Sequence, residues 1–377
     1  MKPTIFLLAC AMTLVSCSNK AEISVFNNSE VDRTNEMVEI CLCRLQKMDP
    51  QKLVILDSEK QPVPVQLLYK GESKPQSLLF PVTLKAGQKK VFTVKTGTPE
   101  TITSKTFVRF VPERKDDIAW ENDRIGFRVY GPALAAEYPS NGVDVWYKRT
   151  PELVVDKWYK NDIAGKASYH EDHGEGLDCY KVGHTLGAGA IAPIAHDSLF
   201  VFDHFDRYKI LDNGPLRSSF LLYYDNVHFG THRLKAEIMV TLDAGSNLNE
   251  AIVNFTGDTT QFNVAAGLCL HDTVQTIYGD AEKGFIGYAE NLYSQTKTPV
   301  ASGRGYTGVI FMTRLSAVKQ VSGHIVGICP YNEGEPFRYY FGAGWSKFGF
   351  PKDQDWFMYL ANKRKALMAP LDIRIYR

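Results

Sequence analysis

The chain has 377 residues and is almost neutral, with 43 Lys and Arg against 42 Asp and Glu. This length is enough for one large or two moderate hydrophobic cores. The balanced charge, with no basic stripe along the chain, argues against a nucleic-acid partner. An aromatic content of 12% suits an all-β core and also surfaces that stack against sugars.

The first 17 residues indicate an exported lipoprotein. A Lys at position 2 precedes a short apolar run that ends in Leu-Val-Ser-Cys at Cys17, and this ending resembles a bacterial lipobox. Lipid on Cys17 would tether the chain to a membrane without a spanning helix. We expect a signal peptide over 1–17 and a periplasmic or outer-membrane-attached protein. An ordinary signal peptide and a buried first helix are the alternatives.

Residues 18–112 predict a small antiparallel β-sandwich. Apolar residues alternate with polar ones in short runs, and Gly, Pro, Asp and Asn separate the runs. Cys41 and Cys43 lie too close along one strand to bridge easily, so we expect free thiols there. The region has no obvious site residues and reads as structural support. A polar hinge over 98–105 leads to the second region, 113–377.

The second region predicts long antiparallel sheets packed face to face. Between Arg233 and Gly257 the chain reads as two strands around a turn at 243–247. One face of the first strand is apolar, with Leu234, Ala236, Ile238, Val240 and Leu242. Helical character is confined to Gln354–Ala369, which Pro370 ends. The expected fold class is therefore all-β with few helices.

The stretch Tyr169–Gly183 is the predicted site. Its sequence, YHEDHGEGLDCYKVG, combines histidines, carboxylates, tyrosines and glycines in a long irregular region, and such loops are more often sites than structure. The spacing of His170, His173 and Glu175 allows a divalent metal, because these are good zinc or manganese ligands. Acid/base catalysis by the histidines without a metal, or a hydrogen-bonded loop, explains the same residues.

The residue types around this loop are those that β-elimination from a uronic acid requires. His170 and His173 can take and give a proton, and Tyr169 and Tyr180 can assist. The sugar carboxylate must be neutralised so that the C5 proton can leave, and nearby cations can do this. The predicted substrate-binding residues are Arg124, Asn122, Lys157, Lys160, Trp345, Lys347 and His204. His271 is a further possible cleft residue. Glycoside hydrolysis by paired carboxylates, with Glu175 leading, is the second hypothesis.

Three separated segments resemble a family of exported proteins that carries the label of a domain of unknown function. They are WENDRIGFRVYGPAL, the YHEDHGEGLDCYKVG loop, and RYYFGAGWSKFGF with DWFMYL. The resemblance implies lipoproteins encoded among polysaccharide-degrading enzymes, with a super-sandwich fold of the galactose-mutarotase type. It also implies kinship with an oligosaccharide dehydratase of ulvan breakdown, which leaves a 4,5-unsaturated sugar.

These lines together predict a carbon–oxygen lyase that acts on oligosaccharides with acidic sugars, either as a dehydratase or as a glycan lyase. A glycoside hydrolase is the alternative enzyme. A sugar-binding lipoprotein without catalytic activity is the alternative from another class.

Overall fold

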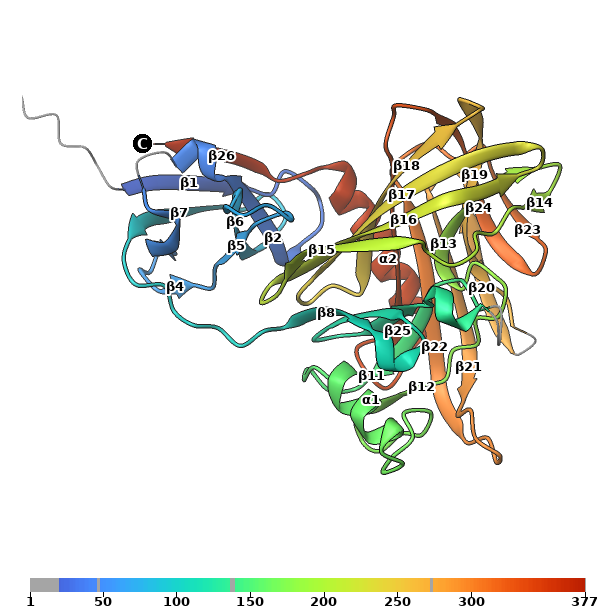
Figure 1. Cartoon of the computed structure of the whole chain (residues 1–377). Helices are drawn as coiled ribbons and strands as arrows, with labels where there is room; N and C mark the ends of the chain where they lie inside the picture. Colours follow the sequence, from blue (N-terminus) through green and yellow to red (C-terminus); the bar gives the residue numbers. More distant parts are fainter. Residues whose placement is uncertain (1–19, 46–47, 136–139, 272–273, 377) are drawn as a thin grey trace, which may run out of the picture.

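The computed structural model describes residues 20–45, 48–135, 140–271 and 274–376, and strands dominate these ranges. The predicted all-β chain, with a small sandwich followed by a larger antiparallel one, is confirmed (Figure 1). The predicted signal peptide and Cys17 lie outside the described residues. The described part has two α-helices, α1 (Val155–Ile163) and α2 (Asp353–Met368), and it holds no helix with the length and apolar character that a membrane crossing needs.

The N-terminal sandwich consists of two antiparallel sheets around one apolar core. In spatial order, the first sheet contains β26 (Asp372–Tyr376), β1 (Lys20–Phe26), β7 (Lys89–Thr96), β3 (Leu53–Leu56) and β4 (Pro62–Val63). The second contains β2 (Arg33–Cys41), β6 (Ser77–Leu84) and β5 (Gln66–Leu68). Buried Ile23, Ile55 and Phe80 contribute to the core between them. The last strand of the chain therefore completes the sandwich that the first strand begins.

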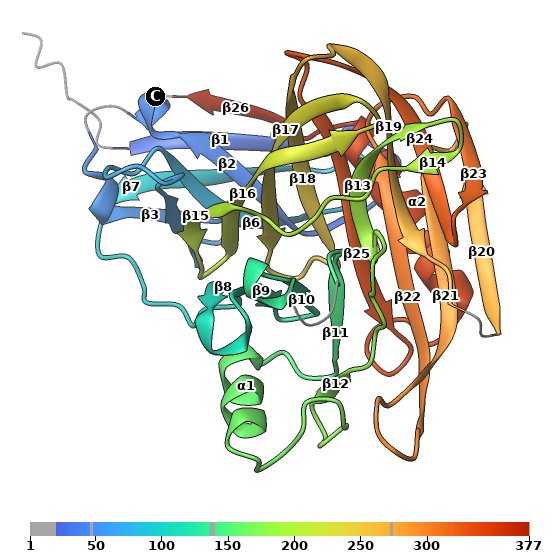
Figure 2. The ribbon, with the colours of Figure 1, turned by 45° about the vertical axis from the view of Figure 1, so that its right-hand side comes forward.

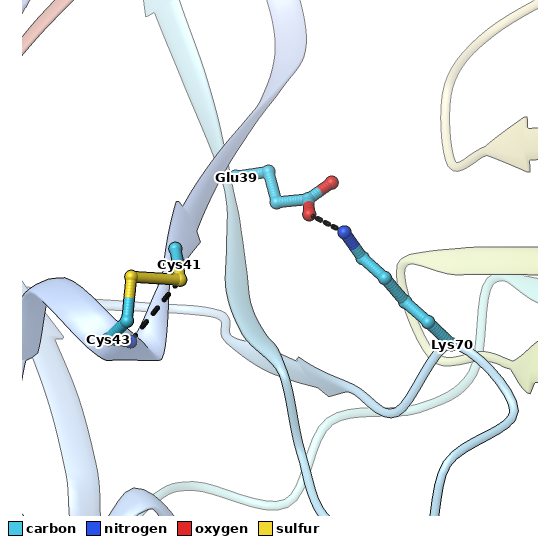
Figure 3. The surroundings of a disulfide bond; sticks show 4 residues. All are labelled: Glu39, Cys41, Cys43 and Lys70. Carbon is cyan, nitrogen blue, oxygen red and sulfur yellow. Dashed lines mark hydrogen bonds and ion pairs between the residues drawn. A yellow bond between two sulfur atoms is a disulfide. The ribbon is translucent and has the colours of Figure 1, made fainter.

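The cysteine prediction is wrong at one position in this sandwich. Cys41 ends β2, and the 3₁₀ turn that follows (Leu42–Leu45) brings Cys43 back, so the two residues form a disulfide (Figure 3). The prediction assumed that both residues lie on one extended strand. The other described cysteines, Cys179, Cys269 and Cys329, are buried free thiols as expected.

The larger sandwich is built on one eight-stranded antiparallel sheet. In spatial order it contains β15 (Arg207–Asn213), β16 (Arg217–Phe229), β17 (His232–Asp243), β18 (Leu248–Gly257), β25 (Phe337–Trp345), β22 (Ala301–Phe311), β21 (Phe285–Tyr293) and β20 (Gln275–Asp280). The predicted face from Leu234 to Leu242 is buried as expected, because its side chains point into the core of the sandwich.

Two five-stranded sheets cover the inner face of this long sheet (Figure 2). One contains β14 (Ser198–Leu199), β13 (Ala188–Ala195), β19 (Gln261–Cys269), β24 (His324–Asn332) and β23 (Ala317–Val321). The other contains β12 (Gly176–Asp178), β11 (Asp144–Lys148), β10 (Gly126–Val129), β9 (Asp117–Asn122) and β8 (Thr106–Val111). Through β8, the larger sandwich begins before the predicted boundary at 112.

Helix α2, predicted at Gln354–Ala369, packs on the outer face of the long sheet. Trp356 and Leu360 are fully buried against β21 and β22. The strands carry glycines where the helix approaches, since a Cβ on Gly308 would lie 2.6 Å from a Leu360 methyl carbon. A helix can approach a sheet this closely only where the strand lacks a side chain.

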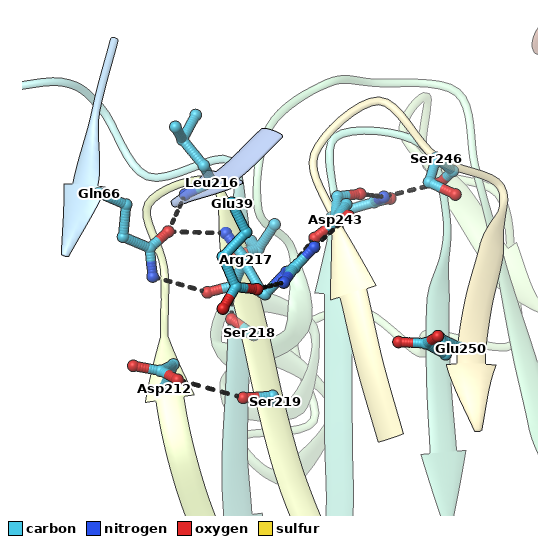
Figure 4. A network of polar contacts seen from close by, with 12 residues as sticks. Glu39, Gln66, Asp212, Leu216, Arg217, Ser218, Ser219, Asp243, Ser246 and Glu250 are labelled. Carbon is cyan, nitrogen blue, oxygen red and sulfur yellow. Dashed lines mark hydrogen bonds and ion pairs between the residues drawn. The ribbon is translucent and has the colours of Figure 1, made fainter. Parts of the chain in front are cut away.

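Polar groups join the N-terminal sandwich to the larger one. Gln66 Oε1 accepts hydrogen bonds from the backbone N–H groups of Leu216 and Arg217, each at 2.7 Å (Figure 4). Asp212 accepts two more from the backbone of Tyr69 and Lys70. Since these acceptors satisfy backbone donors across the junction, they fix how the two sandwiches meet.

Candidate functional site

The predicted site loop leaves helix α1 and returns to the sheet at β12, beside the lower end of the larger sandwich (Figure 2). The sequence analysis confined helical character to Gln354–Ala369, and this is wrong at Val155–Ile163, where α1 forms. Glu121 on β9 is fully buried, and its Oε1 accepts hydrogen bonds from Val154 and Val155 N–H at 2.7 Å. Those are free donors at the start of α1. A capping group 33 residues earlier in the chain leaves no local signal in the sequence.

Tyr169 and His170 form the inner part of the loop. The Tyr169 ring stacks on Trp146 with centroids 5.1 Å apart, and its hydroxyl oxygen accepts a hydrogen bond from Arg114 Nε at 3.0 Å. His170 Nδ1 lies 3.0 Å from the carbonyl oxygen of Asp178. A carbonyl only accepts, so Nδ1 carries the proton and Nε2 keeps its lone pair. Burial lowers the pKa of His170, which favours the neutral ring.

A buried acidic cluster lies behind these two residues, and sequence reasoning did not find it. Arg128 binds Asp144 and Asp178 at 2.6 and 2.9 Å, and Asp117 lies 3.9 Å from the same guanidinium. Burial raises the pKa of all three carboxyls, that of Asp117 to about 6. Arg128 sits on a strand among apolar neighbours, so its partners become visible only when β9, β11 and β12 are aligned.

Four of the predicted site residues line a cavity of about 300 Å³, namely Lys157, Tyr169, His173 and Glu175. His173 is exposed, and its Nε2 lies 3.0 Å from the Ser168 carbonyl oxygen, so Nε2 carries the proton and Nδ1 has the lone pair. Lys157 Nζ binds Glu175 at 2.6 Å. A hydrogen bond from Lys157 lowers the pKa of Glu175, so this carboxyl is ionised at neutral pH.

A larger, more open cavity of about 710 Å³ lies beside the first, and Glu171 borders both. Its walls include Asp172 from the loop, residues 294–302 from the turn after β21 and the start of β22, and Lys347 after β25. Lys347 Nζ lies 3.9 Å from Asp172 and 5.1 Å from the Trp345 ring centroid. The two cavities together can hold more than one sugar ring.

The structure does not assemble the predicted metal site. His170 and His173 each direct one ring nitrogen at a backbone carbonyl, and Glu175 is paired with Lys157. Within 20–45, 48–135, 140–271 and 274–376, no group of three His, Cys, Asp or Glu side chains is arranged to hold a metal ion. The loop spacing alone suggested such a site, but the backbone bonds turn these side chains to other partners.

Several predicted binding residues have structural contacts instead. Trp345 is 1% exposed and donates to the Ser302 carbonyl, so its ring is not free to stack on a sugar. Asn122 is buried and donates to the Asp243 and Ser246 carbonyls. Arg124 lies over the Phe348 ring. Lys160 is exposed on α1, and His204 lies in the 200–206 segment after β14; neither borders the two cavities.

Tyr180, the other predicted catalytic tyrosine, is buried beside an ion pair of His271 with Glu290. The Tyr180 and His271 rings are 5.1 Å apart. His271 Nδ1 lies 2.8 Å from Glu290 Oε2, and its Nε2 lies 2.7 Å from the Lys181 carbonyl oxygen. Burial acts against protonation, but hydrogen bonds with Cys269 and Glu290 raise the pKa of His271 to about 10. His271 is therefore charged at neutral pH, and it donates a hydrogen bond to the Lys181 carbonyl near the end of the site loop.

Comparison with solved structures identifies relatives of the fold. The chain matches an alpha-mannosidase from Enterococcus faecalis V583 with a TM-score of 0.52, at 9% identity, over 96% of this chain and 46% of that one. The match to a protein of glycosyl hydrolase family 38 from the same species has a TM-score of 0.52 at 10% identity, over 96% of this chain and 48% of that one. The chain thus spans about half the length of these structures, and the likeness is one of fold.

Two sequence comparisons cover nearly the whole chain. A Formosa agariphila protein with the name "Uncharacterized protein P7" is 27% identical over 398 residues, which is 98% of each chain. The family model described as "Domain of unknown function (DUF4861)" matches residues 25–373, a range that includes both sandwiches and the site loop. The chain therefore belongs to the DUF4861 family.

Proposed function

We propose that the protein is a carbohydrate-active carbon–oxygen lyase that acts by β-elimination on oligosaccharides containing uronic acids. The observation that carries this proposal is the cavity of about 300 Å³ that collects a histidine, a tyrosine and a lysine from one loop and helix. These are the base, acid and cation that elimination next to a carboxylate needs. The mannosidase-like fold supports a carbohydrate substrate only in general terms.

In the proposed reaction, His173 is the base. Its Nε2–H is engaged with Ser168, so the Nδ1 lone pair takes the C5 proton. The electrons of the C5–H bond form the C4=C5 double bond, and the C4–O bond breaks. Tyr169 protonates the departing oxygen, since its own oxygen accepts from Arg114 and its proton remains available. Lys157 exchanges Glu175 for the sugar carboxylate and stabilises the charge that develops there.

We further propose export and a lipid anchor at Cys17, as the leader predicts. The Cys41–Cys43 disulfide supports this part of the proposal, because disulfides persist mainly in oxidising compartments outside the cytoplasm. The anchor would tether the protein, with its cavities, to a membrane surface.

A glycoside hydrolase is the second candidate. The fold likeness to a glycosyl hydrolase family 38 protein favours it, and Glu171 and Glu175 both border the smaller cavity. Glu175 is held ionised by Lys157, which suits a nucleophile or base rather than a general acid. Hydrolysis would give saturated products, whereas elimination gives a conjugated double bond.

The test follows the ultraviolet absorbance of the unsaturated uronate while the protein is incubated with a panel of uronic-acid oligosaccharides. We expect absorbance to rise with the wild type, and His173→Ala to reduce turnover by about 10²–10⁴-fold, the usual contribution of a general base. Tyr169→Phe should reduce turnover while it keeps the stacking on Trp146. Product masses separate loss of water from chain cleavage.

His228→Ala is the matched control, because His228 is exposed on β16 and borders neither cavity. It should retain wild-type turnover. If the products are shorter and saturated, the protein is a hydrolase and the lyase proposal is wrong. Full turnover in both His173→Ala and Tyr169→Phe would overturn the placement of the site. If the oligosaccharides bind but no product forms, the protein is a sugar-binding protein without catalytic activity.

A further inference from the structure

A third cavity, polar and of about 380 Å³, lies where the N-terminal sandwich, the long sheet and helix α2 meet. It shares no lining residue with the two cavities at the site loop. Its floor is the outer face of β17, β18 and β25, and its walls come from β2 and α2. Junctions between domains are a preferred place for ligand sites, and clefts of about 300–1,000 Å³ are typical of them.

The floor of this cavity carries a row of polar groups in register. Thr241 pairs with Glu250 across β17 and β18, and Glu250 pairs with Tyr340 across β18 and β25. The outer face of an antiparallel sheet is normally polar where it meets water. Here, however, α2 and the N-terminal sandwich lie on either side of this part of the face, so the row lines a groove between them.

Glu250 is held in place with one oxygen still available. Tyr340 donates its hydroxyl to Glu250 Oε1 at 2.8 Å, and Arg338 Nε lies 3.4 Å from the same atom. Oε2 accepts no hydrogen bond from any residue that the structure describes. The Glu250 side chain is 25% exposed, so a ligand can reach it. A carboxylate fixed through one oxygen is a preorganised acceptor for ligand hydroxyl groups through the other.

The cavity also offers donors beside this acceptor. Arg217 is immobilised by bonds to both Asp243 oxygens and to Glu39 (Figure 4). Lys363 on α2 borders the cavity and has no acidic partner within ion-pair distance in the described ranges. Arg338 is 52% exposed. Donors and acceptors therefore face one another across a space of a size that suits one or two sugar rings.

The charge of the lining decides the class of ligand. Each carboxylate of the lining already has a cationic partner: Glu36 pairs with Arg33, Glu39 with Lys70 and Arg217, Asp243 with Arg217, and Glu250 with Arg338. A charged ligand would have to compete with these ion pairs, whereas a polyol can hydrogen-bond to both kinds of group through its hydroxyls without breaking them. We propose that this cavity binds an uncharged hexose or pentose unit of a glycan. The proposal does not depend on the lyase reaction.

The experiment measures binding of methyl α-mannoside, methyl β-galactoside, methyl β-glucoside and methyl β-xyloside by saturation-transfer NMR and calorimetry. Methyl β-glucuronide is the charged comparison for the glucoside. We expect at least one neutral glycoside to bind, and Glu250→Gln to weaken it about tenfold, since a bond to a charged acceptor is lost. Tyr340→Phe keeps the ring and removes only the hydroxyl that fixes Glu250, so it tests the site in a folded protein.

Two controls locate the binding. Glu335→Gln changes an exposed carboxylate outside the cavity and should leave affinity unchanged. His173→Ala should also leave it unchanged, which separates this proposal from the lyase. Absence of binding by every neutral glycoside would overturn the proposal, as would binding that survives both Glu250→Gln and Tyr340→Phe. Tighter binding of the glucuronide than of the glucoside would overturn the ligand class.

Discussion

His271 links the chemistry of a single side chain to the position of the site loop. Its two ring nitrogens face Glu290 and the carbonyl of Lys181, while Tyr180 and Cys269 lie beside it. The imidazolium can hold both acceptors only while both nitrogens carry protons. A neutral ring would leave one of these acceptors without its donor, so protonation of His271 and placement of the loop are coupled.

We predict that His271→Gln lowers the free energy of unfolding by about 3–5 kcal/mol near pH 6, the usual cost of removing one partner of a buried ion pair. The folded pKa of His271, about 10, lies above its ordinary value of 6.5. The stabilisation is therefore fully present below pH 6.5 and is lost as pH rises toward 10. Denaturant unfolding of both proteins across this range measures the difference.

His232→Gln is the control, because His232 forms the same kind of pair with Asp258 at 3.0 Å but on the exposed surface. Its substitution should change the free energy of unfolding by less than about 1 kcal/mol. A difference between wild type and His271→Gln that stays constant from pH 7 to 10 would contradict the assignment of a charged His271.

Helix α1 depends on a group outside itself. Glu121 caps its first turn from β9, and the other Glu121 oxygen binds Lys148 Nζ at 2.5 Å, with both side chains fully buried. With nine residues, α1 is too short to be stable alone. It also supplies Lys157 to the smaller cavity, so the cap supports one wall of the candidate site.

We predict that Glu121→Ala removes the cap of α1 and lowers the free energy of unfolding by about 3–5 kcal/mol, since it leaves Lys148 as a buried cation without its ionic partner. Hydrogen exchange of residues 154–163 should accelerate far more than exchange of α2. Asp156→Ala is the control, because Asp156 is exposed in the first turn of α1. This substitution should lower the free energy of unfolding by about 1 kcal/mol or less. Unchanged exchange over 154–163 in Glu121→Ala would refute the capping role.

At the scale of the whole molecule, the two ends of the chain meet in one sheet. β26 pairs with β1 from Phe26↔Asp372 to Glu22↔Tyr376. Ile373 and Ile375 on β26 pack against the core of the N-terminal sandwich. Arg33 on β2 donates to the carbonyls of Ala366 and Ala369 at the end of α2, which satisfies acceptors that the helix leaves free. The C-terminal segment thus connects the two sandwiches, since α2 packs on the larger one and β26 belongs to the smaller one.

We predict that truncation after Leu371 destabilises the N-terminal sandwich by about 2–4 kcal/mol, because two half-buried isoleucines and the pairing of β1 are lost. Limited proteolysis should then cut first within 20–96, and the melting temperature should fall. Arg374→Ala keeps the strand and changes only an exposed side chain, so it should melt like the wild type. Equal protease resistance of the truncated and full chains would count against this role of β26.

Local patterns in the sequence were sufficient for the features that depend on neighbouring residues. Alternation from Leu234 to Leu242 predicted the buried face of β17, and the helical character of Gln354–Ala369, with Pro370 as its end, predicted α2. The site at Tyr169–Gly183 stays a prediction from composition, and the smaller cavity is lined by Tyr169, His173 and Glu175 from this loop. Such signals work because strand and helix periods are properties of the chain itself.

Only the tertiary structure decided the features in which distant residues meet. The Arg128 cluster joins four strands, α1 is capped by Glu121, and β26 returns to β1. The same holds for Trp345, whose aromatic ring suggested a sugar platform but is buried in the core. Sequence alone determined which segments form strands and which loop is rich in titratable groups. Packing then determined which of those groups remain accessible, since burial and partner choice depend on contacts across the fold.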